Sequence, residues 1–248
     1  MITIASGLEG PDDLALGGDG SIYVSEVKGG RVIRFAPDGK MTVIVSRLKF
    51  PEGLVALSDG SLIIAENGTQ SLLRYDAATQ TITPLITFTL NTPSAPGVDG
   101  IAFDALTNTI IVPLADGGQS RAMRVSLDGK NVKEIARGFA QPSGAWVERD
   151  GSVLVTDKGA GTIKRIRPNG KIEIVSVLPS PDDVIADAFG NLFAITLHDN
   201  ALHWITAGRD TILLKGLHQP EGVIFDAEGN LIITEEEAGK LLKVIIRE

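Results

Sequence analysis

Acidic residues recur along the chain in a short repeated motif, at spacings that could gather them into one site. In each of six copies, a polar residue, here called the marker, follows Pro or Val and precedes an apolar run. Successive markers are 40, 47, 44, 39 and 39 residues apart. The markers are Asp12, Glu52, Asp99, Ser143, Asp182 and Glu221. The motif therefore places carboxylates at equivalent points of a repeated structure.

A second set of positions, here called the return positions, closes the second apolar run of each copy, and four of its six residues are acidic. These positions stand 14 residues after the marker, or 15 in the third copy, and are Glu26, Glu66, Leu114, Asp157, Thr196 and Glu235. Carboxylates held close together raise one another's pKa and destabilise the fold unless a cation or hydrogen-bond donors neutralise them. If markers and return positions share one end of the fold, the pattern predicts a cation site or a substrate site there.

An all-oxygen donor set without cysteine favours a hard divalent cation. Ca²⁺ is the first expectation, with Mg²⁺, Mn²⁺ and Zn²⁺ as alternatives. A plainer interpretation also holds, in which each acid accepts backbone N–H groups or pairs with a loop cation. Lys28 and Lys158 are near enough in sequence to pair with Glu26 and Asp157.

The elements that would position these residues are β-strands. Short β-branched runs, separated every eight to twelve residues by turns such as Gly18-Asp19-Gly20, indicate four antiparallel strands in each copy. The sixth copy stops after its third strand, 241–246, and residues 2–5 can supply the fourth. The marker spacing across the chain ends is again 39 residues. The repeat therefore predicts an all-β, six-bladed β-propeller, a single domain spanning 1–248, closed by its N-terminal strand.

Composition excludes several other classes of protein. The 248 residues include no Cys, which removes disulfides and thiolate chemistry, and the net charge of −8 disfavours nucleic-acid binding. No apolar run approaches the roughly 20 residues that span a bilayer, and residues 1–5 do not resemble a secretory signal. We expect a cytoplasmic monomer with a small-molecule substrate and neither a nucleic-acid nor a membrane partner.

Two segments carry a resemblance to a known family. Residues 181–192, PDDVIADAFGNL, and residues 220–231, PEGVIFDAEGNL, look like blades of the gluconolactonase/regucalcin family and are similar to the broader NHL-type repeat. The resemblance implies a divalent-metal-dependent lactonase with ligands at the markers of blades one, four and five. Asp182 matches that pattern, whereas Asp12 stands where the family has Glu and Ser143 where it has Asn.

The resemblance and the carboxylates together give the expected roles. The expected metal ligands are Asp12, Glu52, Asp99, Asp182 and Glu221. The expected catalytic residues are Asp182, as general base, and His198; the expected substrate-binding residues are Glu26, Glu66, Ser143, Asp157 and Glu235. The leading hypothesis is hydrolysis of a small cyclic ester. The alternatives are a non-catalytic NHL-like propeller that holds a structural Ca²⁺ and, more weakly, a metal-dependent lyase.

Overall fold

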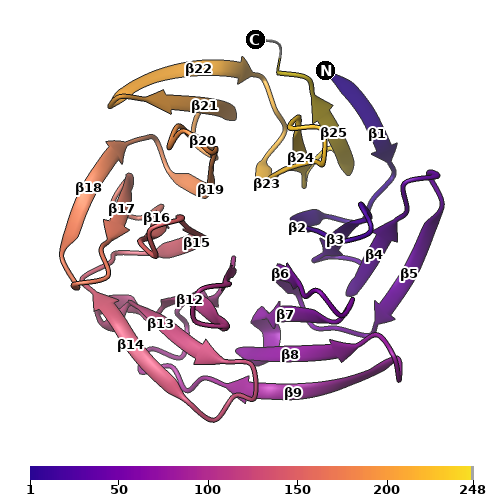
Figure 1. The fold of residues 1–248 in the computed structure, drawn as a ribbon, viewed down its shortest axis with the longest axis horizontal. Helices are drawn as coiled ribbons and strands as arrows, with labels where there is room; N and C mark the ends of the chain where they lie inside the picture. The colour runs from indigo at the N-terminus through magenta and orange to yellow at the C-terminus, as the bar shows by residue number, and fades with distance from the viewer. Residues whose placement is uncertain (247–248) are drawn as a thin grey trace. The chain divides into compact units, whose positions relative to one another are not determined.

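The computed structural model describes residues 1–246, which form six antiparallel sheets; five have four strands in series, and the remaining one has a fifth, short strand beside such a series. The fold is the expected six-bladed β-propeller, and each sheet is one blade (Figure 1). The blades fall into two units of three. None of the helical segments in residues 1–246 has the length and apolarity to span a bilayer.

The first unit comprises Met1–Thr87 and His218–Glu248. Its first two blades are β2 (Pro11–Leu16), β3 (Ile22–Glu26), β4 (Arg31–Phe35) and β5 (Met41–Ser46), then β6 (Pro51–Ala56), β7 (Leu62–Glu66), β8 (Ser71–Asp76) and β9 (Thr81–Thr87). The remaining blade of this unit, the sixth along the chain, is β23 (Pro220–Phe225), β24 (Leu231–Glu235), β25 (Lys240–Val244) and β1 (Ile2–Ser6). The pairing of β1 with β25 confirms the predicted closure, although β25 ends at Val244 rather than at residue 246.

The second unit is Phe88–Leu217. The third blade along the chain is β10 (Gly97–Val98) with β11 (Ala102–Asp104), β12 (Thr109–Ala115), β13 (Arg121–Ser126) and β14 (Val132–Arg137). The fourth is β15 (Pro142–Val147), β16 (Val153–Asp157), β17 (Thr162–Ile166) and β18 (Ile172–Val177). The fifth is β19 (Pro181–Ala186), β20 (Leu192–Thr196), β21 (Ala201–Thr206) and β22 (Arg209–Lys215). The first strand of the third blade, expected as one run, is split into β10 and β11, and Asp99 lies in the gap between them.

Within the second unit, the second strand β16 is covered on both faces by neighbouring blades. Val155 of β16 belongs to an apolar cluster shared with the preceding blade, whereas its neighbour Leu154 belongs to a cluster shared with the following blade. Because side chains alternate along a strand, both faces of β16 are buried. This packing explains the unbroken apolar runs of the sequence.

A β-bulge begins the first strand of five blades. In β15, Pro142 pairs with Asp157 but the next pair is Ala145 with Val155, so two residues of the first strand oppose one of the second. The same shift follows Pro11, Pro51, Pro181 and Pro220. The marker is one of the two bulged residues each time. A bulge re-aims side chains, which frees the marker from the regular inside–outside alternation of the strand.

The glycine after the marker of β15 allows the next blade to approach closely. A Cβ atom built on Gly144 would lie 2.6 Å from the Asp183 Oδ1 atom and 2.7 Å from the Asp182 carbonyl oxygen. Replacing Gly144 by Ala should therefore displace β19 and lower the free energy of unfolding by about 1–3 kcal/mol. Urea unfolding measures the loss, and Gly118→Ala, where a Cβ would meet nothing within 4 Å, is the matched control. Equal stability of the two variants would contradict this close approach.

Candidate functional site

Three markers of the second unit meet around one lysine. The Ser143 hydroxyl lies 2.6 Å from Asp99 Oδ2 and 3.0 Å from Asp182 Oδ1. Lys158 Nζ lies 2.7 Å from Asp182 Oδ1 and 3.4 Å from Asp99 Oδ2. We call these four residues the lysine cluster. The starts of three successive blades supply its two carboxylates and its hydroxyl, and the residue that follows β16 supplies the ammonium group.

The lysine cluster is mostly buried. Ser143 is fully buried, and the Asp182 side chain is 7% exposed. The side chains of Lys158 and Asp99 are 18% and 17% exposed. Lys158 and Asp99 therefore keep some exposure to solvent, whereas Asp182 and Ser143 are almost completely buried.

Burial and charge act against each other at Asp182. Burial raises the pKa of its carboxyl group, the charge of Lys158 lowers it, and the charge of Asp99 raises it again; the net pKa lies above the ordinary value for Asp. A raised pKa makes a carboxylate a stronger base than an exposed Asp. A pKa that is shifted both by burial and by a specific charged partner is typical of residues in functional sites.

The backbone at Asp182 is held by the neighbouring blade. The Thr156 hydroxyl donates to the Asp182 carbonyl at 2.5 Å and accepts from the Gly144 N–H at 2.7 Å. One buried side chain in β16 therefore links the bulges of two first strands. This link fixes Asp182 relative to Ser143 and preorganises the cluster.

A divalent cation does not fit the lysine cluster. The Lys158 ammonium lies between the two carboxylates that would ligate the ion, and a second positive charge there would meet strong repulsion. Residues 1–246 contain no group of three or more His, Asp or Glu residues arranged to hold a metal. The lysine side chain already supplies the neutralising charge expected from a metal.

The markers of the first unit contact other polar groups. Glu52 Oε2 accepts a bond from the Asn67 side chain at 3.0 Å, and Glu221 Oε1 accepts one from Gln219 at 2.8 Å. The backbone carbonyl of Asp12 accepts a hydrogen bond from the Thr234 hydroxyl, as the Asp182 carbonyl does from Thr156. That Asp12, Glu52 and Glu221 bind a metal stays a prediction.

Four return carboxylates anchor the loops that lead into the first strands. Glu26, Glu66, Asp157 and Glu235 are at most 7% exposed. Each accepts hydrogen bonds from backbone N–H groups of the loop before its own blade. Glu26 accepts from Glu9 at 2.8 Å, and Glu66 accepts from Lys49 at 2.8 Å. Asp157 accepts from Ala140 and Gln141 at 2.8–3.1 Å, and Glu235 accepts from His218 at 2.9 Å. Their carboxylates therefore hold loops in place, and substrate binding by these four residues stays a prediction.

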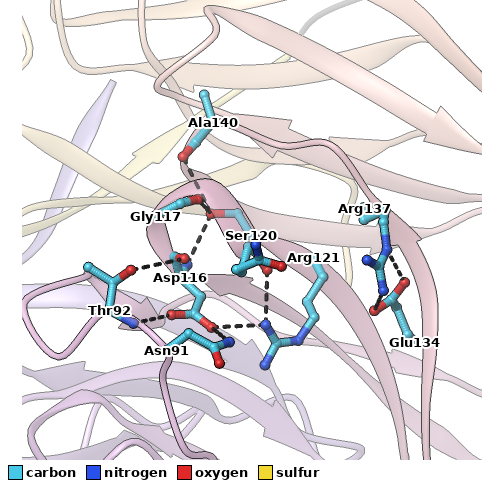
Figure 2. A network of polar contacts seen from close by, with 10 residues as sticks. Asn91, Thr92, Asp116, Gly117, Ser120, Arg121, Glu134, Arg137 and Ala140 are labelled. Carbon is cyan, nitrogen blue, oxygen red and sulfur yellow. Dashed lines mark hydrogen bonds and ion pairs between the residues drawn. The ribbon is translucent and has the colours of Figure 1, made fainter.

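The third blade has an equivalent carboxylate that the repeat count misses. Leu114, the expected return position, is a buried apolar residue of β12, and Asp116 follows the end of the strand. Asp116 accepts bonds from the Thr92 N–H at 2.9 Å, the Asn91 amide at 2.7 Å and Arg121 at 2.9 Å (Figure 2). Burial raises the pKa of Asp116, but these bonds outweigh it and lower the pKa to about 2. In the sequence, Asp116 can be recognised as the acidic residue that directly follows the long second strand of this blade.

The loop lysines have partners other than those the spacing indicated. Lys28 pairs with Glu236 at 3.0 Å, while Glu26 pairs with Arg31. Lys158 pairs with the two markers, while Asp157 pairs with Lys164 at 2.8 Å. Lys158 directly follows a buried strand residue, and alternation turns its side chain toward the opposite side from Asp157.

The histidines lie outside the lysine cluster. His198 is exposed in the loop between β20 and β21, so a catalytic role for it stays a prediction. His203 is 2% exposed inside β21, with Nδ1 2.8 Å from Asp210 and Nε2 3.2 Å from Asp199. That setting is structural.

Comparisons with known proteins give similarity of fold. No family model matches the chain, and no curated protein matches its sequence. A gluconolactonase from Xanthomonas campestris superposes with a TM-score of 0.81 at 15% identity, over 98% of this chain and 89% of that one. Regucalcin from Agrobacterium tumefaciens, described as calcium-binding, gives 0.81 at 14% identity over 98% and 92%.

A third neighbour has a different activity. Virginiamycin B lyase from Staphylococcus aureus has a TM-score of 0.72 at 17% identity, over 96% of each chain. Identities this low show the fold alone, because one fold hosts many activities. By structure, the chain is a six-bladed β-propeller whose neighbours include gluconolactonase and regucalcin, as the two blade segments indicated.

Proposed function

We propose that this chain hydrolyses a small cyclic ester at the lysine cluster, with Lys158 supplying the positive charge. The observation that carries the proposal is the position of the Lys158 ammonium, between two carboxylates and on a side chain that is 18% exposed. The gluconolactonase neighbours support the class of substrate. No step of the reaction passes through a metal.

Each residue of the cluster has a separate task in this reaction. The Lys158 ammonium donates to the lactone carbonyl and stabilises the negative charge that develops on its oxygen when water attacks. Asp182 accepts the proton of that water, since burial makes it more basic; Ser143 and Lys158 both bond to its Oδ1 atom. Asp99 and Ser143 hold Lys158 and Asp182 in place. The ring C–O bond breaks, and the leaving alkoxide takes back the proton that Asp182 accepted from the water, which gives the hydroxy acid and restores the Asp182 carboxylate.

A panel of lactones tests this proposal. Protein stripped with EDTA should open at least one five- or six-membered lactone, measured by acid release, and added Ca²⁺ should not raise the rate. The product should be heavier than the substrate by one water. A product of unchanged mass would instead show elimination, the activity class of the lyase neighbour. Turnover only after metal addition, or no turnover of any lactone, would contradict the proposal.

Ligand binding without turnover is the second candidate. It is favoured because hydrogen bonds already join all four members of the lysine cluster, which leaves the carboxylates well satisfied. In that case, lactones or hydroxy acids would protect the protein against thermal unfolding while no product accumulates.

A further inference from the structure

A basic groove lies between the first two blades of the first unit, in an otherwise acidic chain. It has a volume of about 380 Å³ and is lined by three loops: 27–30 after β3, 47–50 before β6, and Gly68 after β7. Three cationic residues line it, Lys28, Arg47 and Lys49, and no acidic residue does. With a net charge of −8 for the whole chain, such a local excess of positive charge is unexpected.

The groove is held in shape by backbone hydrogen bonds between its loops. The Leu48 N–H donates to the Gly30 carbonyl at 2.9 Å, and the Gly68 N–H donates to the Lys49 carbonyl at 2.9 Å. The Lys49 N–H donates to the buried Glu66 carboxylate at 2.8 Å. Each wall is therefore fixed to another part of the fold before any ligand binds, which lowers the entropy lost on binding.

Arg47 occupies a backbone conformation that other blades give to glycine. It lies four residues before the Pro that begins β6 and has a φ of +65°. The equivalent residues before β2, β15 and β23 are Gly7, Gly138 and Gly216, with φ of +77°, +88° and +75°. A side chain in this left-handed region is strained, whereas Gly is not. A strained residue in a groove points to a function that outweighs the strain.

The charges of the groove indicate the kind of ligand. Arg47 and Lys49 form no ion pair within residues 1–246, and Lys28 shares its charge with Glu236 at 3.0 Å. Two unmatched cations suit a dianion, and a guanidinium binds phosphate through two parallel bonds. Phe50 also lines the groove and is 58% exposed, which offers a face for an apolar group.

We infer that this groove binds a small phosphate monoester, with Arg47 and Lys49 on the phosphate and Phe50 against the organic group. The inference is independent of the proposed hydrolysis, because every residue it uses lies in the first unit and none belongs to the lysine cluster.

Calorimetric titration of the whole protein with phenyl phosphate and with inorganic phosphate tests this inference. Phenyl phosphate should bind more tightly than inorganic phosphate, and Phe50→Ala should remove the difference. Arg47→Gly and Lys49→Gln should each weaken binding roughly tenfold or more. Lys215→Gln is the matched control, because it removes an exposed charge outside the groove and should leave the affinity unchanged.

Thermal stability separates a binding role for Arg47 from a structural one. A Cβ atom at each of the three equivalent glycines would meet nothing within 4 Å. Glycine is therefore favoured at this position because of the backbone conformation, not because a side chain would clash. Arg47→Gly should therefore melt at or above the temperature of the natural protein while binding phenyl phosphate more weakly. A lower melting temperature, equal affinity in Arg47→Gly and Lys215→Gln, or no binding at millimolar phenyl phosphate would overturn the inference.

Discussion

Replacing Asp182 by Asn is expected to lower the rate of lactone hydrolysis by about 10²–10⁴-fold, the usual contribution of a positioned general base. The amide keeps the shape of the side chain and can still face Lys158 and Ser143, but it cannot take a proton from water. The loss should fall on kcat rather than on KM, because the substrate binds through Lys158. Initial rates at saturating lactone measure it.

Asp157→Asn is the matched control for this experiment. Asp157 is also a buried carboxylate paired with a lysine in the same unit, at 2.8 Å from Lys164 against 2.7 Å for Asp182 and Lys158. It anchors a loop, so its replacement should reduce stability and leave kcat per folded molecule near that of the natural protein. Equal losses of kcat in the two variants would mean that Asp182 acts only through the fold.

Replacing Asp116 by Ala is expected to lower the free energy of unfolding by about 3–5 kcal/mol. The change leaves the Arg121 guanidinium, the Thr92 N–H and the Asn91 amide without the fully buried carboxylate that joins them (Figure 2). Urea unfolding measures the loss as a lower midpoint at an unchanged slope. Asp38→Ala, which removes an exposed turn carboxylate, should lower it by less than about 1 kcal/mol.

The contribution of Asp116 should also depend on pH in a defined direction. Its pKa in the folded protein is about 2, below the ordinary 3.8, so its stabilisation is present above about pH 4 and is lost as the pH falls toward 2. The difference in unfolding free energy between the natural protein and Asp116→Asn should be constant from pH 7 to 5 and shrink below pH 4. A difference that grows on acidification would contradict the assigned ion pair.

Most of the fold could be predicted from sequence because the repeat fixes it at several levels. The marker spacing predicted the number of blades, and the turn residues predicted where the strands begin and end. The last blade lacked a fourth strand at the C-terminal end of the chain, which indicated that residues 2–5 complete it, and they do so as β1. The third blade was the exception. Its first strand breaks around Asp99, and a count from the marker reaches Leu114 instead of Asp116.

The candidate site could be predicted only in part. Markers of successive blades do converge, as Asp99, Ser143 and Asp182 show. Sequence distance alone favours a pair between Lys158 and its neighbour Asp157, whereas strand alternation directs Lys158 to the markers. The same alternation places Asn67, one residue beyond Glu66, on Glu52. In these two blades, the residue directly after the return position is the partner of a marker.

A crystal structure of the protein grown with millimolar Ca²⁺ tests the central claim most directly, because it shows which cation neutralises Asp99 and Asp182. We expect Lys158 Nζ within hydrogen-bonding distance of Asp182, close to Asp99, and no ion between the carboxylates. A Ca²⁺ ion ligated by Asp182 and Asp99, with the Lys158 side chain turned away, would contradict the account.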